Sequence, residues 1–160
     1  MSQAYVDAIT RAYEKINFIS RFERILVHTD FANRLRKPDK KQVLRILSDL
    51  GYTFQVRTPG PEYFSEEVHG EFKFRFVLDL NGGIVLGYIY VFLNDEKVEF
   101  PYPNLVFTYK YLLNDLDRLM DPSTIFVDYE EMKIIVKDLL DIYSDFKVAF
   151  LKEAANTTNA

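Results

Sequence analysis

The sequence predicts an α+β domain, with N-terminal helices, a central antiparallel β-meander with an aromatic core face, and a long C-terminal helix. Residues 72–80 alternate apolar and polar side chains, and residues 84–93 return after an Asn-Gly-Gly turn. Before and after this hairpin, apolar residues recur at spacings of three and four, as in amphipathic helices. A chain of 160 residues suits one domain, assigned to 1–155, with 156–160 as a frayed tail.

Three helical units are predicted before the sheet. The first has one apolar stripe and can be capped by Ser2; the stripe comprises Tyr5, Ala8, Ile9, Ala12, Tyr13 and Ile16. Ser20 and Glu23 stand in capping-box register, which predicts either a second helix or a bend near Ser20 in one long helix. A third helix follows Pro38 and ends at Gly51.

The sheet is predicted from alternation and from turn residues. Residues 52–57 form a strand that ends before Pro59, and the polar residues 62–70 form an exposed connection. The clearest strand buries one face, made of Phe72, Phe74, Phe76, Leu78 and Leu80. Gly82 and Gly83 supply a hairpin turn. The return strand has one face made of Leu86, Tyr88, Tyr90 and Phe92, and a turn at 94–97 precedes a short strand at 98–100.

The second half is predicted to alternate between short strands and helices. Residues 105–108 are assigned to a strand, and a helix from Tyr109 stops before Pro122. A short strand at 124–127 follows. Asp128 and Glu131 repeat the capping-box register, which predicts a last helix over residues 129–155.

Composition excludes several chemistries. The chain has no cysteine, so disulfides, thiolate nucleophiles and iron–sulfur clusters are excluded. The N-terminus lacks the pattern of a signal peptide, and the longest apolar run, 82–93, is about half the ~20 residues of a membrane span. We therefore expect a cytoplasmic protein without a membrane contact.

Charge is unevenly distributed along the chain. Residues 1–80 carry 13 Lys or Arg and 11 Asp or Glu, whereas residues 81–160 carry 7 and 13. The acidic second half argues against nucleic-acid binding there. The basic cluster from Arg34 to Lys41 has no interleaved aromatic residue, so it is interpreted as a solvated helix junction.

No motif of catalysis or cofactor binding is present. His28 and His69 are far apart and belong to no metal-binding pattern, so they are interpreted as ordinary surface or capping residues. Phosphate-binding, nucleophile-elbow and calcium-loop patterns are also missing from the sequence. We expect no catalytic residue, no metal and no cofactor.

Acidic and tyrosine side chains of the second half are predicted to form a partner-binding surface. An acidic field speeds association with a basic partner, and tyrosine gives a large contact area with a polar tip. The candidate contact residues are Tyr109, Tyr111, Asp115, Asp117, Asp121, Glu130 and Glu131.

In overall character the chain resembles the immunity proteins of bacterial polymorphic-toxin systems. The features that carry the resemblance are the hairpin over 72–93, the aromatic stretch 102–111 and the acidic helices over 115–145. The resemblance implies a non-enzymatic protein that binds one cognate toxin and occludes its active site, which would be a basic cleft.

Two other functions remain open. A small-molecule-binding domain or an enzyme would have a pocket between the sheet and the long helix. Its candidate polar groups are Glu66, His69, Arg75, Tyr88 and Tyr90. A structural subunit would instead dock through the sheet edge or the last helix.

Overall fold

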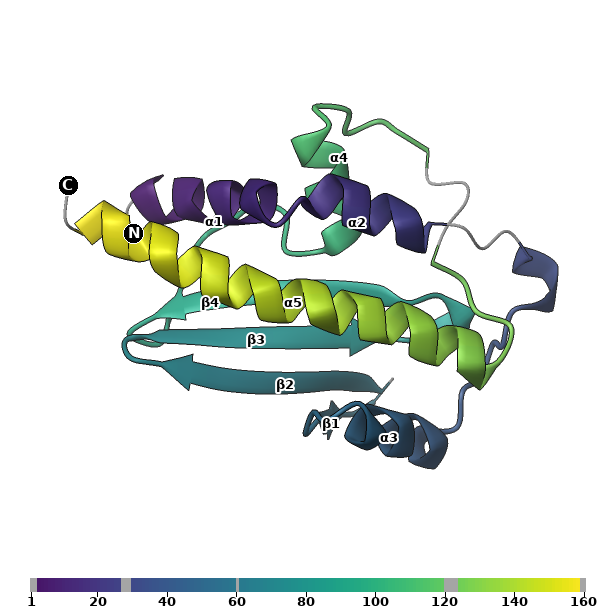
Figure 1. Cartoon of the computed structure of the whole chain (residues 1–160). Coiled ribbons are helices and arrows are strands. Elements are labelled where there is room, and N and C mark those ends of the chain that lie inside the picture. Colours follow the sequence, from purple (N-terminus) through teal and green to yellow (C-terminus); the bar gives the residue numbers. More distant parts are fainter. Residues whose placement is uncertain (1–2, 27–29, 60, 120–123, 159–160) are drawn as a thin grey trace.

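The computed structural model describes residues 3–26, 30–59, 61–119 and 124–158, and it confirms the α+β class (Figure 1). Five antiparallel strands lie in the order β1-β2-β3-β4-β5, which is a meander. They span Gln55–Arg57, Glu62–His69, Phe72–Asp79, Leu86–Leu93 and Glu96–Lys97. The helices are α1 (Gln3–Lys15), α2 (Phe18–Ile25), α3 (Lys40–Asp49), α4 (Leu105–Leu112) and α5 (Tyr129–Thr158), with short 3-10 turns at Phe31–Asn33 and Asn81–Gly83.

Helices α1, α2 and α5 lie on one side of the sheet (Figure 1). The core forms between this layer and the sheet, because β3 directs Phe72, Phe74 and Phe76 toward the helices. The ring of Phe76 stacks on Tyr143 of α5 at 4.9 Å, and Phe74 meets Phe150 edge-on at 5.7 Å. The aromatic core face predicted for the sheet is therefore packed mainly against the long helix.

One boundary between helices differs from the prediction. The break between the first two helices lies at Asn17, which has φ 56°, rather than at Ser20, which lies inside α2. Asparagine tolerates this left-handed conformation better than most residues. Ser2, the predicted cap of the first helix, lies outside the described residues.

The largest correction concerns residues 62–70, of which 62–69 form strand β2 instead of an exposed connection. All eight residues of β2 pair with β3, from Glu62 opposite Asp79 to His69 opposite Phe72. The prediction was wrong because Ser65, Glu67 and His69 alternate on the helix side, so the strand lacks the apolar alternation that identified β3.

Strand β4 directs its aromatic side chains away from the core. Its core positions are Gly87, Ile89 and Val91, whereas the predicted face of Leu86, Tyr88, Tyr90 and Phe92 is half-buried on the side of the sheet away from the helices. Asn94 and Asp95, both with positive φ, make a tight turn into β5. The strand predicted at 98–100 is not formed, and β5 ends at Lys97.

The region 105–119 folds differently from the prediction. Residues 105–108 are the first turn of α4 instead of a strand, because Asn104 caps the helix by accepting a hydrogen bond from the Val106 amide at 2.9 Å. The helix ends at Leu112, and Asn114 follows with φ 56°. The predicted continuation toward Pro122 is therefore wrong over residues 113–119.

The capping box of the long helix is confirmed. The Asp128 carboxylate accepts a hydrogen bond from the Glu131 amide at 2.8 Å, and the Glu131 carboxylate accepts one from the Val127 amide at 2.8 Å. Helix α5 continues to Thr158, three residues beyond the predicted end. Of the short strand predicted at 124–127, a single bridge between Ile125 and Ile84 is present.

Candidate functional site

Exposed apolar side chains are concentrated in α4 and the loop after it, residues 105–119, which we call the docking segment. Eight large hydrophobic side chains are strongly exposed in the described part of the chain. Four of them lie in this segment, within a stretch of 13 residues: Phe107, Tyr111, Leu116 and Leu119. Since surface hydrophobic residues are normally scattered singly, this clustering marks the segment as a candidate contact surface.

The inner face of α4 explains why its outer face is presented to solvent. Leu105, Thr108 and Tyr109 are buried against the domain. The Tyr109 hydroxyl donates a hydrogen bond to Glu23 of α2 at 3.0 Å, and the Thr108 hydroxyl donates one to the Tyr102 carbonyl at 2.6 Å. With this face fixed, Phe107 and Tyr111, four residues apart, project together on the outside.

The loop of the docking segment folds back onto its helix. The Asp115 amide donates to the Lys110 carbonyl at 2.9 Å, and the Asp115 carboxylate lies 3.7 Å from Arg118. Leu119 is 89% exposed and Leu116 46%. The loop therefore combines backbone contacts that shape it with apolar side chains that have little cover.

The structure brings only part of the predicted contact surface together. Tyr111, Asp115 and Asp117 lie exposed in the docking segment. Tyr109 is 2% exposed and belongs to the core, so its prediction as a contact residue was wrong. Glu130 and Glu131 lie in the first turn of α5, away from α4 in Figure 1, and Asp121 is outside the described residues.

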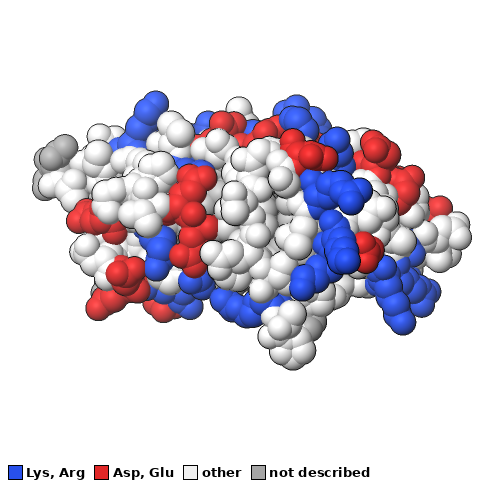
Figure 2. Space-filling model, turned by 90° about the horizontal axis from the view of Figure 1, so that it is seen from below, with Lys and Arg blue, Asp and Glu red and all other residues white. Residues whose placement is uncertain are grey.

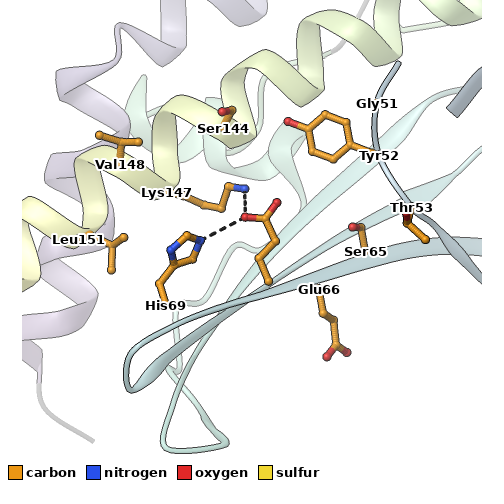
Figure 3. Close-up of a pocket in the computed structure, with 11 residues that line it drawn as sticks. Gly51, Tyr52, Thr53, Ser65, Glu66, His69, Ser144, Lys147, Val148 and Leu151 are labelled. Carbon is orange, nitrogen blue, oxygen red and sulfur yellow. Dashed lines mark hydrogen bonds and ion pairs between the residues drawn. The ribbon is translucent and has the colours of Figure 1, made fainter. Parts of the chain in front are cut away.

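A groove of about 660 Å³ opens between β2 and α5 (Figure 3). Strand β2 contributes Ser65, Glu67 and His69. Helix α5 contributes side chains that are one and two turns apart, from Ser144 to Leu151. Residues 51–53, which precede β1, close one end (Figure 3). The lining residues are Gly51, Tyr52, Thr53, Ser65, Glu66, Glu67, His69, Ser144, Lys147, Val148 and Leu151. This is the location expected for the alternative, ligand-binding function.

A three-residue ionic network lies inside the groove. The Lys147 ammonium donates to Glu67 Oε2 at 2.5 Å, and His69 Nε2 lies 3.2 Å from the same oxygen. Burial raises the pKa of the Glu67 carboxyl, but the Lys147 and His69 hydrogen bonds outweigh it, so this pKa lies below its usual value. The Lys147 side chain is only 8% exposed, so the ion pair is held in place by packing.

A buried hydroxyl lies beneath this network. The Lys147 ammonium stands 4.2 Å from the centre of the Tyr143 ring. The Tyr143 hydroxyl is buried and has no hydrogen-bond partner among the described residues. Burial, followed by the nearby Glu67 carboxylate, raises the pKa of Tyr143. An unpaired buried hydroxyl is energetically costly, and this one lies next to the ion pair of the groove.

The other polar groups proposed for a pocket lie on the far side of the sheet. Glu66 points away from the groove in Figure 3 and forms an ion pair with Arg75 at 2.6 Å. Tyr88 and Tyr90 stack in parallel on that outer side, with ring centres 6.4 Å apart. Of the five candidates, only His69 contributes its side chain to the groove.

The outer side of the sheet is mixed in charge. Arg75 and Lys73 lie 5.1 and 4.9 Å from the Phe92 ring centre, and Figure 2 shows acidic and basic side chains intermixed on the underside of the molecule. Burial and the nearby Asp79 carboxylate raise the pKa of Tyr88. Carboxylates beside the tyrosines disfavour a phosphate backbone at this surface.

Within the basic cluster over 34–41, Arg34 has a structural role. Arg34 donates from Nε to the Gly82 carbonyl at 2.8 Å and stacks over Phe31 at 3.7 Å. Gly83 has φ 77°, and a Cβ there would approach the Leu35 carbonyl to 2.8 Å. Asp39 caps α3 by accepting from the Gln42 amide at 3.1 Å. These contacts fix the junction between the N-terminal helices and the sheet.

Other features limit the chemistry of the described residues. Within them, no three His, Asp or Glu side chains are grouped as a metal site would require. No described helix combines the length and apolar character needed to cross a bilayer. His28, one of the two histidines considered from sequence, lies outside the described residues. Comparisons with family models, curated proteins and solved structures find no match.

The sequence predicted a possible pocket between the sheet and the long helix, but it did not predict the pairing of Glu67 with Lys147 inside the groove. Glu67 and Lys147 are 80 residues apart, and neither stands out locally. One signal was available: Ser65, Glu67 and His69 alternate at period two, which is compatible with a strand that has a polar inner face.

Proposed function

We propose that this chain is a non-enzymatic protein-binding domain that contacts its partner through the docking segment. The observation that supports the proposal is the concentration of exposed Phe107, Tyr111, Leu116 and Leu119 on an anchored helix and its loop. Burying one such side chain in an interface contributes about 1.5–3 kcal/mol. A few apolar and aromatic anchors of this kind account for most of the affinity of a typical interface.

The charges of the docking segment are balanced, because Lys110 and Arg118 lie in it together with the exposed Asp115 and Asp117. The acidic excess that would favour a basic partner belongs to the second half of the chain as a whole, in which residues 81–160 carry 13 Asp or Glu and 7 Lys or Arg. Carboxylates at the rim of an apolar contact accelerate association with a basic surface and contribute specificity. The function we propose is therefore that of an immunity protein, which binds a cognate bacterial toxin in the cytoplasm and occludes a basic active-site cleft.

The proposal is tested by co-expressing the chain with the product of the neighbouring gene in a bacterial host. We expect growth inhibition by that product to be relieved by the chain, and the purified pair to bind with a sub-micromolar Kd. A double substitution, Leu116→Asp with Leu119→Asp, should weaken binding at least 100-fold and abolish the rescue.

A matched control is available on α5. Ile134 is 57% exposed, and it lies outside both the docking segment and the groove. Ile134→Asp should leave rescue and affinity unchanged. A neighbouring product without toxicity, or a complex that tolerates the double substitution, would refute the proposal.

A further inference from the structure

We infer that the free edge of β2, together with the groove beside it, binds an extended, uncharged peptide segment as an added β-strand. Strand β1 pairs with β2 only from Glu62 to Phe64. Residues 65–69 pair with β3 on one side, and no described strand pairs with them on the other. An edge of this kind presents backbone donors and acceptors that an extended chain can satisfy.

The groove reaches the backbone of this edge. Glu66 lines the groove although its side chain points away from it in Figure 3, so its main chain faces the cavity. Residues 51–53 diverge from β2 and close one end. An added segment that paired with the five residues 65–69 would be about 17 Å long.

Helix α5 supplies the wall opposite the edge. Val148 is 56% exposed and lines the groove together with Leu151, near the His69 end (Figure 3). Ser144 lies near Tyr52 at the other end. Alternate side chains of an added strand would point toward this wall, because successive residues of a strand face opposite sides.

The charge of the groove selects an uncharged ligand. Lys147 and Glu67 neutralise each other inside it, so the ion pair has no net charge with which to attract an anionic or a cationic ligand. Peptide groups carry both a donor and an acceptor without net charge. An extended main chain therefore matches both the edge and the compensated ion pair.

The direction of the bound peptide strand and its expected residue pattern follow from the geometry of the sheet. Every pair in this sheet is antiparallel, and β1 already runs antiparallel to β2. A peptide strand added antiparallel to β2 starts near His69 and ends near Ser65. The expected pattern is an apolar residue over Val148 and Leu151, followed two positions later by a serine, threonine or asparagine that faces Tyr52 and Ser144.

This site is separate from the docking segment, so the two proposals can fail independently. The groove is lined by residues of 51–53, 65–69 and 144–151, and none of them belongs to 105–119. Loss of binding through the docking segment would leave the peptide site intact, and the reverse also holds.

The test uses a phage-displayed library of random heptapeptides panned against the full chain. Selected peptides should share the apolar-x-polar pattern, and a synthetic copy should shift the amide resonances of residues 65–69 and 144–151. Methylation of alternate backbone nitrogens in that peptide should weaken binding at least tenfold, since it removes the donors of strand pairing.

Two variants of α5 provide the comparison. Val148→Glu should lower the affinity for the synthetic peptide at least tenfold. Ile134→Glu, on the same helix but outside the groove, should leave this affinity unchanged. Both positions are more than half exposed, so both variants are expected to fold, which circular dichroism and thermal unfolding check.

Three outcomes would overturn the inference. They are failure to select any peptide, equal binding of the peptide to wild type and Val148→Glu, and unchanged affinity after N-methylation. If the library yields no peptide and a small polar compound binds the groove instead, the groove is a small-molecule site and the peptide proposal is wrong.

Discussion

The docking segment and the groove differ in which parts of the chain form them and in which interactions they offer a ligand. The docking segment comes from one stretch of sequence and exposes apolar side chains, including Leu119 at 89%. The groove joins three distant stretches and contains a compensated ion pair, hydroxyl groups and a strand edge. One surface offers hydrophobic burial, whereas the other offers hydrogen bonds.

Because of this difference, substitutions in the two regions should differ in their effects on partner binding and on the stability of the fold. The exposed side chains of the docking segment, such as Leu116 and Leu119, have little cover from the domain, so changing them should affect a partner more than the fold. Lys147, Glu67 and Tyr143 are part of the packing between β2 and α5, so changing them should affect the fold first. The following substitutions test that separation.

The largest effect on stability is expected for Lys147→Ala. It removes a packed side chain and leaves the Glu67 carboxylate with His69 as its remaining partner. Because Glu67 is about one-third exposed, we expect a loss of about 2 kcal/mol in the free energy of unfolding, less than for a fully buried pair. Urea denaturation measures this loss, and Glu67→Gln with Lys147→Met should recover part of it. An unchanged midpoint would show that the pair contributes nothing.

The next effect is the pH dependence of stability. The pKa of Glu67 is lowered in the folded chain, as is that of Glu153, which hydrogen-bonds to Lys15 and Arg11. A lowered folded-state pKa gives stability that is present above the unfolded value of about 4.5 and is lost as the pH falls through the folded value. Denaturation curves at a series of acidic pH values should therefore show a steep loss. Glu67→Gln should make that loss shallower, and an identical slope would contradict the role of the pair.

A smaller effect of opposite sign is expected for Tyr143→Phe. The substitution keeps the ring stacked on Phe76 and removes a buried hydroxyl that has no partner among the described residues. Removing such a group should raise the free energy of unfolding by about 1 kcal/mol. Thermal unfolding measures the gain. A loss of stability would instead indicate that the hydroxyl is hydrogen-bonded, for example to a bound water.

The smallest effect on stability is expected for Leu119→Asp in the docking segment. Its side chain has little contact with the domain, so the free energy of unfolding should change by less than about 0.5 kcal/mol. The same urea denaturation measures this change. A loss of several kcal/mol would show that the segment is part of the core and would weaken its assignment as a contact surface.

Local patterns in the sequence predicted the elements with strong periodicity or caps. Phe72, Phe74 and Phe76 identified β3, and Asp128 with Glu131 identified the start of α5, because these signals depend on neighbours in the chain. Strand β2 was missed because its inner face is polar. Residues 105–108 were predicted as a strand, but Asn104 caps helix α4 at this point by accepting a hydrogen bond from the Val106 amide.

The candidate site was predicted only where it is local. Tyr111, Asp115 and Asp117 are exposed in one segment as expected, whereas Tyr109 is on the buried face of the same helix. A tyrosine in a short helix gives no sign of which side it occupies until the helix has a known start and a known packing face.

Hydrophobic periodicity and capping residues act over a few neighbouring positions, so they were sufficient to predict the α+β class, the central hairpin and the long last helix. The strand and groove wall formed by the polar residues 65–69 depend instead on contacts that are remote in sequence. These contacts are the ladder with β3 and the ion pair of the partly exposed Glu67 with Lys147, 80 residues away on α5.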